Sequence, residues 1–281
     1  RPGGPDPAPG VPLGSRVRAT RPGTVGVSPA TDGARGAGSP DLAAGHAVEN
    51  LRALLASGLD VRRPVQGKPA TTWLTEMYTR SDRAPRFLQL LLQHGAELDD
   101  PLLAPVLLDD TSTLESVLAV SPSLLAHRTT LACAFTPLHG ASLLHVAAEY
   151  GCLQAARVLL ATGADVDARA GLDAQGLGGH TPLFHTVNTN AGRGLPLLEL
   201  LLAAGARTDV RVAGLTWGGG FEWETTLFDL TPIAYAQCGL LPQMHRDERQ
   251  TWATVRRLLE AGGRVVPPLG NVPNRYLQPR R

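Results

Sequence analysis

The sequence predicts an all-α repeat array in which pairs of short helices stack on one another. One observation is a leucine-rich phrase ending in glycine that recurs five times along the 281-residue chain. A second is a capped helix start upstream of these glycines, and a third is an apolar content of 43%, enough for a sizeable core. The chain exceeds the usual domain of roughly 100 to 150 residues, and the recurrences favour a repeat array over two domains.

The recurring phrase predicts helix C-termini. Two leucines, two spacer residues and a glycine recur at 54–58, 91–95, 159–163, 201–205 and 258–262. The leucines form the apolar end of an amphipathic helix, and glycine adopts without steric cost the left-handed conformation that ends a helix. The predicted helix ends are Gly58, Gly95, Gly163, Gly205 and Gly262.

The second phrase predicts helix starts. A Ser or Thr hydroxyl accepts from the free N–H groups of the first turn, and a following Pro is already set for helical φ. The predicted starts are Ser142, Thr181, Thr231 and, more weakly, Thr72.

Together the two phrases resemble the ankyrin repeat, whose pattern runs Thr-Pro-Leu-His, two alanines, a turn glycine, a leucine-ended helix and Gly-Ala-Asp. The resemblance is nearly complete from Ser142 to Asp167 and weakens toward both ends of residues 41–263. The 21 positions from Ser142 to Gly163 match the family spacing, so we interpret Thr136 as part of the preceding finger loop. The resemblance implies an ankyrin-repeat solenoid with long finger loops, and a structural hydrogen-bonding role for His145.

The predicted domain organisation is a Pro/Gly-rich tail, a repeat domain and a Pro-rich C-terminal tail, over residues 1–40, 41–266 and 267–281. Eight Pro and nine Gly among the first 40 residues leave little apolar surface to offset the entropy of ordering, so we expect disorder there. The predicted units are 41–66, 67–100, 101–135, 136–175, 176–225 and 226–266, the third being degenerate.

Charge and composition exclude several classes of protein. The net charge of +1 divides into +3 on residues 1–40, +4 on residues 264–281 and −6 on residues 41–263. The tails lack the dense basic clusters that neutralise many phosphates, so we expect no nucleic-acid binding, and the acidic body favours a basic protein partner. The longest uncharged apolar stretches fall far short of the roughly 20 residues that a membrane span needs, so we expect no membrane association.

Cysteine usage favours a reducing compartment. The three cysteines form no Cys-x-x-Cys pair, which argues against a disulfide framework or a structural zinc site. We therefore expect a cytoplasmic protein, with a targeting segment upstream of Arg1 left open.

Insertions distinguish the last two units. The finger between Gly205 and Thr231 exceeds the family spacing by about 13 residues and holds four of the 13 aromatic residues within twelve positions. Helix-to-helix connections are lengthened at 188–194 and 239–248. A finger with four glycines over 171–179 lacks the Lys-Ser/Thr of a phosphate loop, so we interpret these glycines as structural.

Large aromatic residues on a projecting loop are typical of binding hot spots. We therefore predict that the last finger loops bind a protein partner. The candidate partner-binding residues are Trp217, Phe221, Glu222, Trp223, Glu224, Phe228, His185 and His245. The alternative is that the aromatic residues form a small satellite core that holds the long hairpin together.

The sequence thus predicts a monomeric, non-enzymatic interaction module without cofactor or metal. No Gly-x-Ser-x-Gly or His-x-x-x-His spacing occurs to support catalysis or metal binding. The alternative function is a metal- or small-molecule-dependent enzyme between the last two fingers, using His185, Glu222, Glu224 and His245. One Lys beside 25 Arg indicates a GC-rich, bacterial genome. Bacterial ankyrin proteins include immunity proteins and effectors, so the resemblance makes these the roles to test.

Overall fold

The computed structural model describes residues 40–77 and 83–263, with side chains described from Ala47 onward. These residues belong to one of the two units into which the chain divides, Pro40–Arg281. The disordered tail predicted for residues 1–40 and the Pro-rich tail predicted for residues 267–281 lie outside these ranges, apart from Pro40. No helix in the described ranges is both long enough and apolar enough to cross a membrane.

The first three helices share a small core of their own. They are α1 (Pro40–Ala56), α2 (Ala70–Glu76) and α3 (Ala84–Gln93). The helix start predicted at Thr72 is wrong, because α2 begins two residues earlier and Pro69 occupies its N-cap. The buried side chains between these helices are Val48, Leu55, Val61, Leu90, Leu91 and Ala96.

The degenerate third unit supplies short helices and a cap for its neighbour. Its elements are η1 (Pro101–Leu103), α4 (Ala104–Leu107), α5 (Thr111–Val120) and η2 (Pro122–Ala126). Asp109, which lies between α4 and α5, has a left-handed φ of 53°. Its carboxylate accepts from Ala155 N at 2.6 Å and Gln154 N at 3.3 Å, two free donors in the first turn of α7 (Leu153–Ala161).

The central unit follows the family pattern. Strand β1 (Thr129–Leu131) pairs antiparallel with β2 (Leu138–Ala141), and α6 (Leu143–Tyr150) follows directly. Ser142 is the N-cap of α6, which confirms that Thr136 belongs to the finger. Gly151 ends α6 at φ 77°, and α7 packs beside α6.

The predicted role of His145 at the start of α6 is confirmed. Its Nδ1 accepts from Ser142 N at 3.2 Å and lies 2.7 Å from Ser142 Oγ. Because Nδ1 is an acceptor, Nε2 carries the hydrogen, and it donates to His180 O at 3.1 Å. One buried imidazole therefore caps its own helix and ties it to the next unit.

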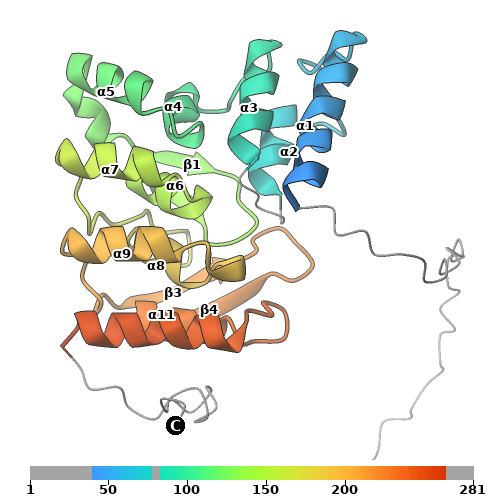
Figure 1. Ribbon diagram of the computed structural model, residues 1–281. Helices are drawn as coiled ribbons and strands as arrows, with labels where there is room; N and C mark the ends of the chain where they lie inside the picture. The colour runs from blue at the N-terminus through green and yellow to red at the C-terminus, as the bar shows by residue number, and fades with distance from the viewer. Residues whose placement is uncertain (1–39, 78–82, 264–281) are drawn as a thin grey trace, which may run out of the picture. The chain divides into compact units, whose positions relative to one another are not determined.

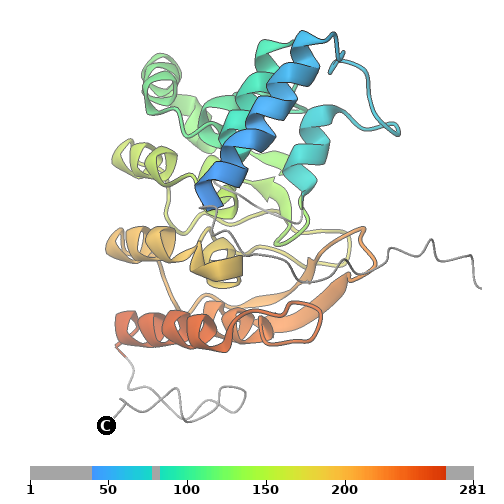
Figure 2. The same ribbon diagram turned by 45° about the vertical axis from the view of Figure 1, so that its right-hand side comes forward.

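The last two units continue the stack with shorter inner helices. Their helices are α8 (Phe184–Val187), η3 (Asn190–Gly192), α9 (Leu195–Ala203), α10 (Pro232–Cys238) and α11 (Glu248–Ala261). The inner helices α6, α8 and α10 contact one another in order. The outer helices α5, α7, α9 and α11 lie in successive layers along one side (Figures 1 and 2). This arrangement is the predicted stack of helix pairs.

Most of the predicted helix caps and helix ends are confirmed. Thr231 Oγ1 accepts from Ala234 N at 3.2 Å, whereas Thr181 makes no capping bond and α8 begins only at Phe184. Four of the five predicted terminal glycines are left-handed, namely Gly58, Gly95, Gly163 and Gly205. The fifth is wrong by one residue, because Gly262 has φ −78° and Gly263 takes the left-handed conformation instead.

The all-α class is wrong for two of the finger loops, which form two-stranded sheets. In the longest finger, β3 (Val212–Trp217) pairs antiparallel with β4 (Thr225–Leu230). A long insertion must satisfy its own backbone N–H and C=O groups, and a hairpin does so locally. Gly178 N donates to Gly214 O at 2.8 Å, so the glycine-rich finger contacts β3.

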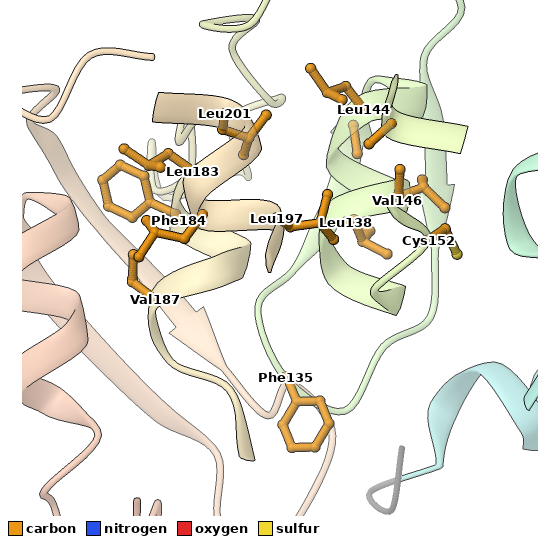
Figure 3. Close-up of a cluster of buried hydrophobic side chains, with 14 of the residues drawn as sticks. Phe135, Leu138, Leu144, Val146, Cys152, Leu183, Phe184, Val187, Leu197 and Leu201 are labelled. Atoms are coloured by element: carbon orange, nitrogen blue, oxygen red, sulfur yellow. The ribbon is translucent and has the colours of Figure 1, made fainter. Parts of the chain in front are cut away.

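The units from α3 to α11 share one apolar core. Figure 3 shows part of it, where side chains of α6, α8 and α9 meet. The residues labelled there are Phe135, Leu138, Leu144, Val146, Cys152, Leu183, Phe184, Val187, Leu197 and Leu201. No unit of this kind can bury its apolar face alone, so stability comes from the stacking.

Candidate functional site

The aromatic finger has an inner and an outer face. Strand alternation directs Leu215, Trp217 and Leu227 inward, and Trp217 has no exposed surface. Its ring centroid lies 6.2 Å from that of Phe135, and Gly218 N donates to Phe135 O at 3.1 Å. Trp217 is therefore a core residue rather than a contact for a partner, which corrects its predicted role.

The turn of the hairpin carries a second aromatic pair. Phe221 and Trp223 stack with ring centroids 4.7 Å apart and an interplanar angle of 18°. Both are half-buried and pack against the main core. The satellite-core alternative thus describes these two residues better than the hot-spot prediction does.

The remaining predicted contact residues face solvent. Phe228 is 68% exposed and pairs in register with Gly214, so no cross-strand side chain covers it. Glu222 and Glu224 are exposed in the turn, and Glu224 Oε2 accepts from Gly220 N at 2.7 Å. His245 is also exposed, at a φ of 50°.

His185 lies elsewhere, buried on α8. Its Nδ1 donates to Glu149 Oε2 at 2.8 Å, while Nε2 is buried without a hydrogen-bond partner. Its ring lies 5.5 Å from that of His145 and 5.0 Å from that of His180. The structure therefore separates His185 from the exposed Glu222, Glu224 and His245.

Two of the buried histidines, His145 and His180, are held neutral. Burial, and next the neighbouring His185, lowers the pKa of His145 to about 3. The same causes hold the pKa of His180 well below its usual value. Within the described ranges, no three His, Cys, Asp or Glu side chains are arranged so that they could hold a metal ion, so the metal-dependent alternative has no geometric support there.

A cavity of about 480 Å³ opens beside His185. Its walls come from the C-terminal ends of α6 and α8, the connection at 188–194 and the loop before α11. The lining includes Phe135, Glu149, Tyr150, Asn188 and Arg246. Sequence reasoning missed this site, although two of its walls are the lengthened connections at 188–194 and 239–248.

Arg246 is the buried cation of this cavity and is 8% exposed. Its Nε donates to Asn188 Oδ1 at 3.0 Å, and its Nη1 donates to Met244 O at 2.9 Å and to Asn190 Oδ1. The guanidinium carbon lies 5.5 Å from the ring centroid of Phe135 and 5.9 Å from that of Trp217. Neutral hydrogen-bond acceptors and aromatic faces thus stabilise the charged guanidinium. No carboxylate of the described residues forms an ion pair with it.

Further polar contacts join the cavity wall to the stack. The Tyr235 hydroxyl on α10 lies 2.8 Å from Thr136 Oγ1 in the finger. Burial raises the pKa of Tyr235, and the hydrogen bond to Thr136 opposes this shift only in part. The Cys133 thiol donates to Glu149 Oε1 at 3.1 Å. The segment 133–137 therefore ties α6 to α10.

The stacked helix pairs joined by finger loops define a helical repeat protein. The family model described as Ankyrin repeat matches residues 139–170. Among solved structures, the chain is similar to an ankyrin repeat domain from Acinetobacter baumannii AYE, with 20% identity over 79% of this chain and 96% of that chain and a TM-score of 0.31. No curated protein matches the sequence. Residues 139–170 are therefore an ankyrin repeat, set within a longer stack of helix pairs.

Proposed function

We propose that this protein is a non-enzymatic module that binds a protein partner through the outer face of the β3–β4 hairpin. Ankyrin repeats are generally protein–protein interaction modules, and this chain contains one of them at residues 139–170. The proposal rests mainly on the exposure of Phe228, a large aromatic side chain on strand β4 that is 68% exposed. An exposed aromatic residue on a rigid support is typical of a binding hot spot.

The hairpin is suited to present Phe228 rigidly. Leu215, Trp217 and Leu227 anchor its inner face in the core, and the glycine-rich finger contacts the backbone of β3 at Gly214. A loop held in this way loses little conformational entropy when a partner binds. The neighbouring finger adds Leu172, whose side chain is 59% exposed.

We propose a partner with a basic surface. Glu222 and Glu224 are exposed in the turn, whereas Arg211 on the hairpin is already paired with Asp229. The acidic turn and the charge of −6 on residues 41–263 would speed and orient the approach of a basic protein. The proposed contact set is Phe228, Leu172, Glu222 and Glu224, with His245 at its edge.

Affinity capture from the source cell, read by mass spectrometry, tests this proposal. Phe228→Ser should lower the yield of the captured partner at least about tenfold, which is the effect of losing one hot-spot residue. Val120→Ser is the matched control, because Val120 is an exposed apolar residue at the end of α5 with 84% exposure. Equal yields from both variants would refute the proposed contact face.

We further propose that the protein acts as a monomer in the bacterial cytoplasm, in an immunity or effector role. The single Lys beside 25 Arg supports a GC-rich bacterial source. Sedimentation of the purified chain together with its captured partner tests the oligomeric state. Co-expression of this protein with a toxin encoded by a neighbouring gene tests the immunity role. An immunity protein should protect the cells from that toxin.

A further inference from the structure

We infer that the cavity beside Arg246 binds a small organic monocarboxylate. The carboxylate would pair with the Arg246 guanidinium, and an apolar body would lie against Phe135, Tyr150 and Leu197 on the cavity wall. This site lies apart from the proposed contact set and adds a small-molecule ligand to a protein-binding module.

Arg246 carries a positive charge in a buried position. A buried guanidinium is costly unless hydrogen bonds and an opposite charge compensate for its lost hydration. Nε and Nη1 are used by Asn188, Asn190 and Met244 O, while Nη2 donates to no group of the described residues. Among the described residues the charge therefore lacks an anion, and Nη2 is an unused donor on a residue that lines the cavity.

Arg246 is fixed in place before any ligand arrives. Its backbone N donates to Gly239 O at 2.8 Å, and a Cβ on Gly239 would lie only 2.8 Å from Arg246 Cγ. The preceding residue, His245, takes the left-handed φ of 50° that turns the chain here. Since the side chain is already ordered, a bound carboxylate gains a charged hydrogen bond at little entropic cost.

The rest of the wall selects the kind of anion. A volume of about 480 Å³ falls within the range of roughly 300–1,000 Å³ that is usual for small-molecule sites. Glu149 and Asp109 also line the cavity and would repel a ligand with more than one negative charge. Arg193 lines it as well, but its side chain is exposed, so solvent screens its charge.

The geometry supports binding and no chemical step. His185 and Glu149 form a buried pair in the wall, which resembles the orienting half of a general-base system. However, His185 Nε2 is closed to solvent and has no hydrogen-bond partner, so a ligand in the cavity does not reach it in this conformation. The proposed site therefore needs only Arg246 and the apolar wall.

Ligand-observed NMR on the full chain tests the inference. The probes are phenylacetate, 3-phenylpropanoate and octanoate, each at concentrations up to about 10 mM and each compared with its primary amide. We expect at least one carboxylate to bind, and its amide to bind at least about tenfold more weakly because it carries no charge. Phenyl phosphate should bind no better than phenylacetate.

Three variants locate the site. Arg246→Gln removes the charge, and Leu153→Trp fills the cavity from a half-buried wall position without touching Arg246. Each should weaken carboxylate binding at least about tenfold, which corresponds to about 1.4 kcal/mol. Arg211→Gln, which removes an exposed arginine from the hairpin, is the matched control and should leave binding unchanged.

The outcomes are decisive in either direction. The inference is overturned if no carboxylate in the panel binds, if the amides bind equally well, if phenyl phosphate binds more tightly, or if Leu153→Trp leaves the affinity intact. Leu153→Trp decides the matter if Arg246→Gln does not fold, as shown by circular dichroism. Partner capture through Phe228 is a separate measurement, so its failure would not affect this result.

Discussion

In the repeat at residues 139–170, the buried polar groups have hydrogen-bond partners, some of them in the neighbouring units, whereas the next unit leaves several of its buried polar atoms without one among the described residues. His145 caps α6 and bonds to the next unit, and Asp109 caps α7. In the next unit, Thr181 Oγ1, His180 Nδ1 and His185 Nε2 are all buried without a hydrogen-bond partner. The regular repeat thus pairs its buried polar groups, and the insertions of the later units add the projecting hairpin and two walls of the cavity.

The hairpin itself shows the same division between its two faces. Trp217 is fully buried on the inner face, and Phe228 is largely exposed on the outer one. These two aromatic residues lie eleven positions apart in one finger, and the sequence alone predicts the same partner-binding role for both. Only one of them is available to a partner.

The largest expected effect on the free energy of unfolding distinguishes the inner face of the hairpin from its outer face. Trp217→Ala should lower the free energy of unfolding by about 3–5 kcal/mol, because it leaves a cavity under the hairpin. Phe228→Ala should change it by less than about 0.5 kcal/mol, since the side chain is exposed. Urea unfolding followed by circular dichroism measures both, and equal losses would show that the two faces are not distinct.

The second prediction concerns the buried histidines that join the regular and irregular units. Burial lowers the folded-state pKa of His145 to about 3, against an unfolded value of about 6.5. Below pH 6.5 the unfolded chain therefore binds more protons than the folded one, and stability falls as the pH falls toward 3. Between pH 6.5 and 5.0 we expect a loss of up to about 2 kcal/mol from this residue, with His180 acting in the same direction.

Urea unfolding at a series of pH values measures this slope. His145→Asn should lower stability at neutral pH and also reduce the slope between pH 6.5 and 5.0. His94→Gln, at an exposed histidine, should leave the slope unchanged. A slope unaffected by either substitution would assign the acid sensitivity to other groups.

A smaller effect tests how the degenerate third unit supports the regular one. Asp109→Ala removes the acceptor for Ala155 N and Gln154 N at the start of α7. We expect a loss of about 1 kcal/mol, the usual cost of removing a helix cap. Thr231→Ala, which removes the cap of α10, should cost a similar amount. No loss at Asp109 would indicate that water replaces it.

The smallest expected effect lies on the outer face of the hairpin. Arg211 forms an ion pair with Asp229, and both side chains are mainly exposed. Solvent screens such pairs, so Arg211→Gln should leave the unfolding midpoint within experimental error. A clear loss of stability would mean that this pair, and not the inner face alone, holds the hairpin.

Local patterns in the sequence predict most of the helices but little of the cavity. Ser142, Thr231 and four of the five glycine helix ends are correct, because a cap depends on neighbours within a few residues. The errors at Thr72 and Thr181 occur where packing shifts or shortens a helix. The hairpin was predicted only in the satellite-core alternative, and the all-α fold class left out its two strands.

The sequence by itself determined the ankyrin repeat, the order of the helix pairs and the place of the insertions, because helix periodicity, capping and glycine ends are local in the chain. Only the tertiary structure decided which aromatic residue is buried and what the insertions build. Trp217 and Phe135 meet across 82 positions, and Arg246 reaches Asn188 across 58. Contacts of that range depend on how the units stack, which no local pattern encodes.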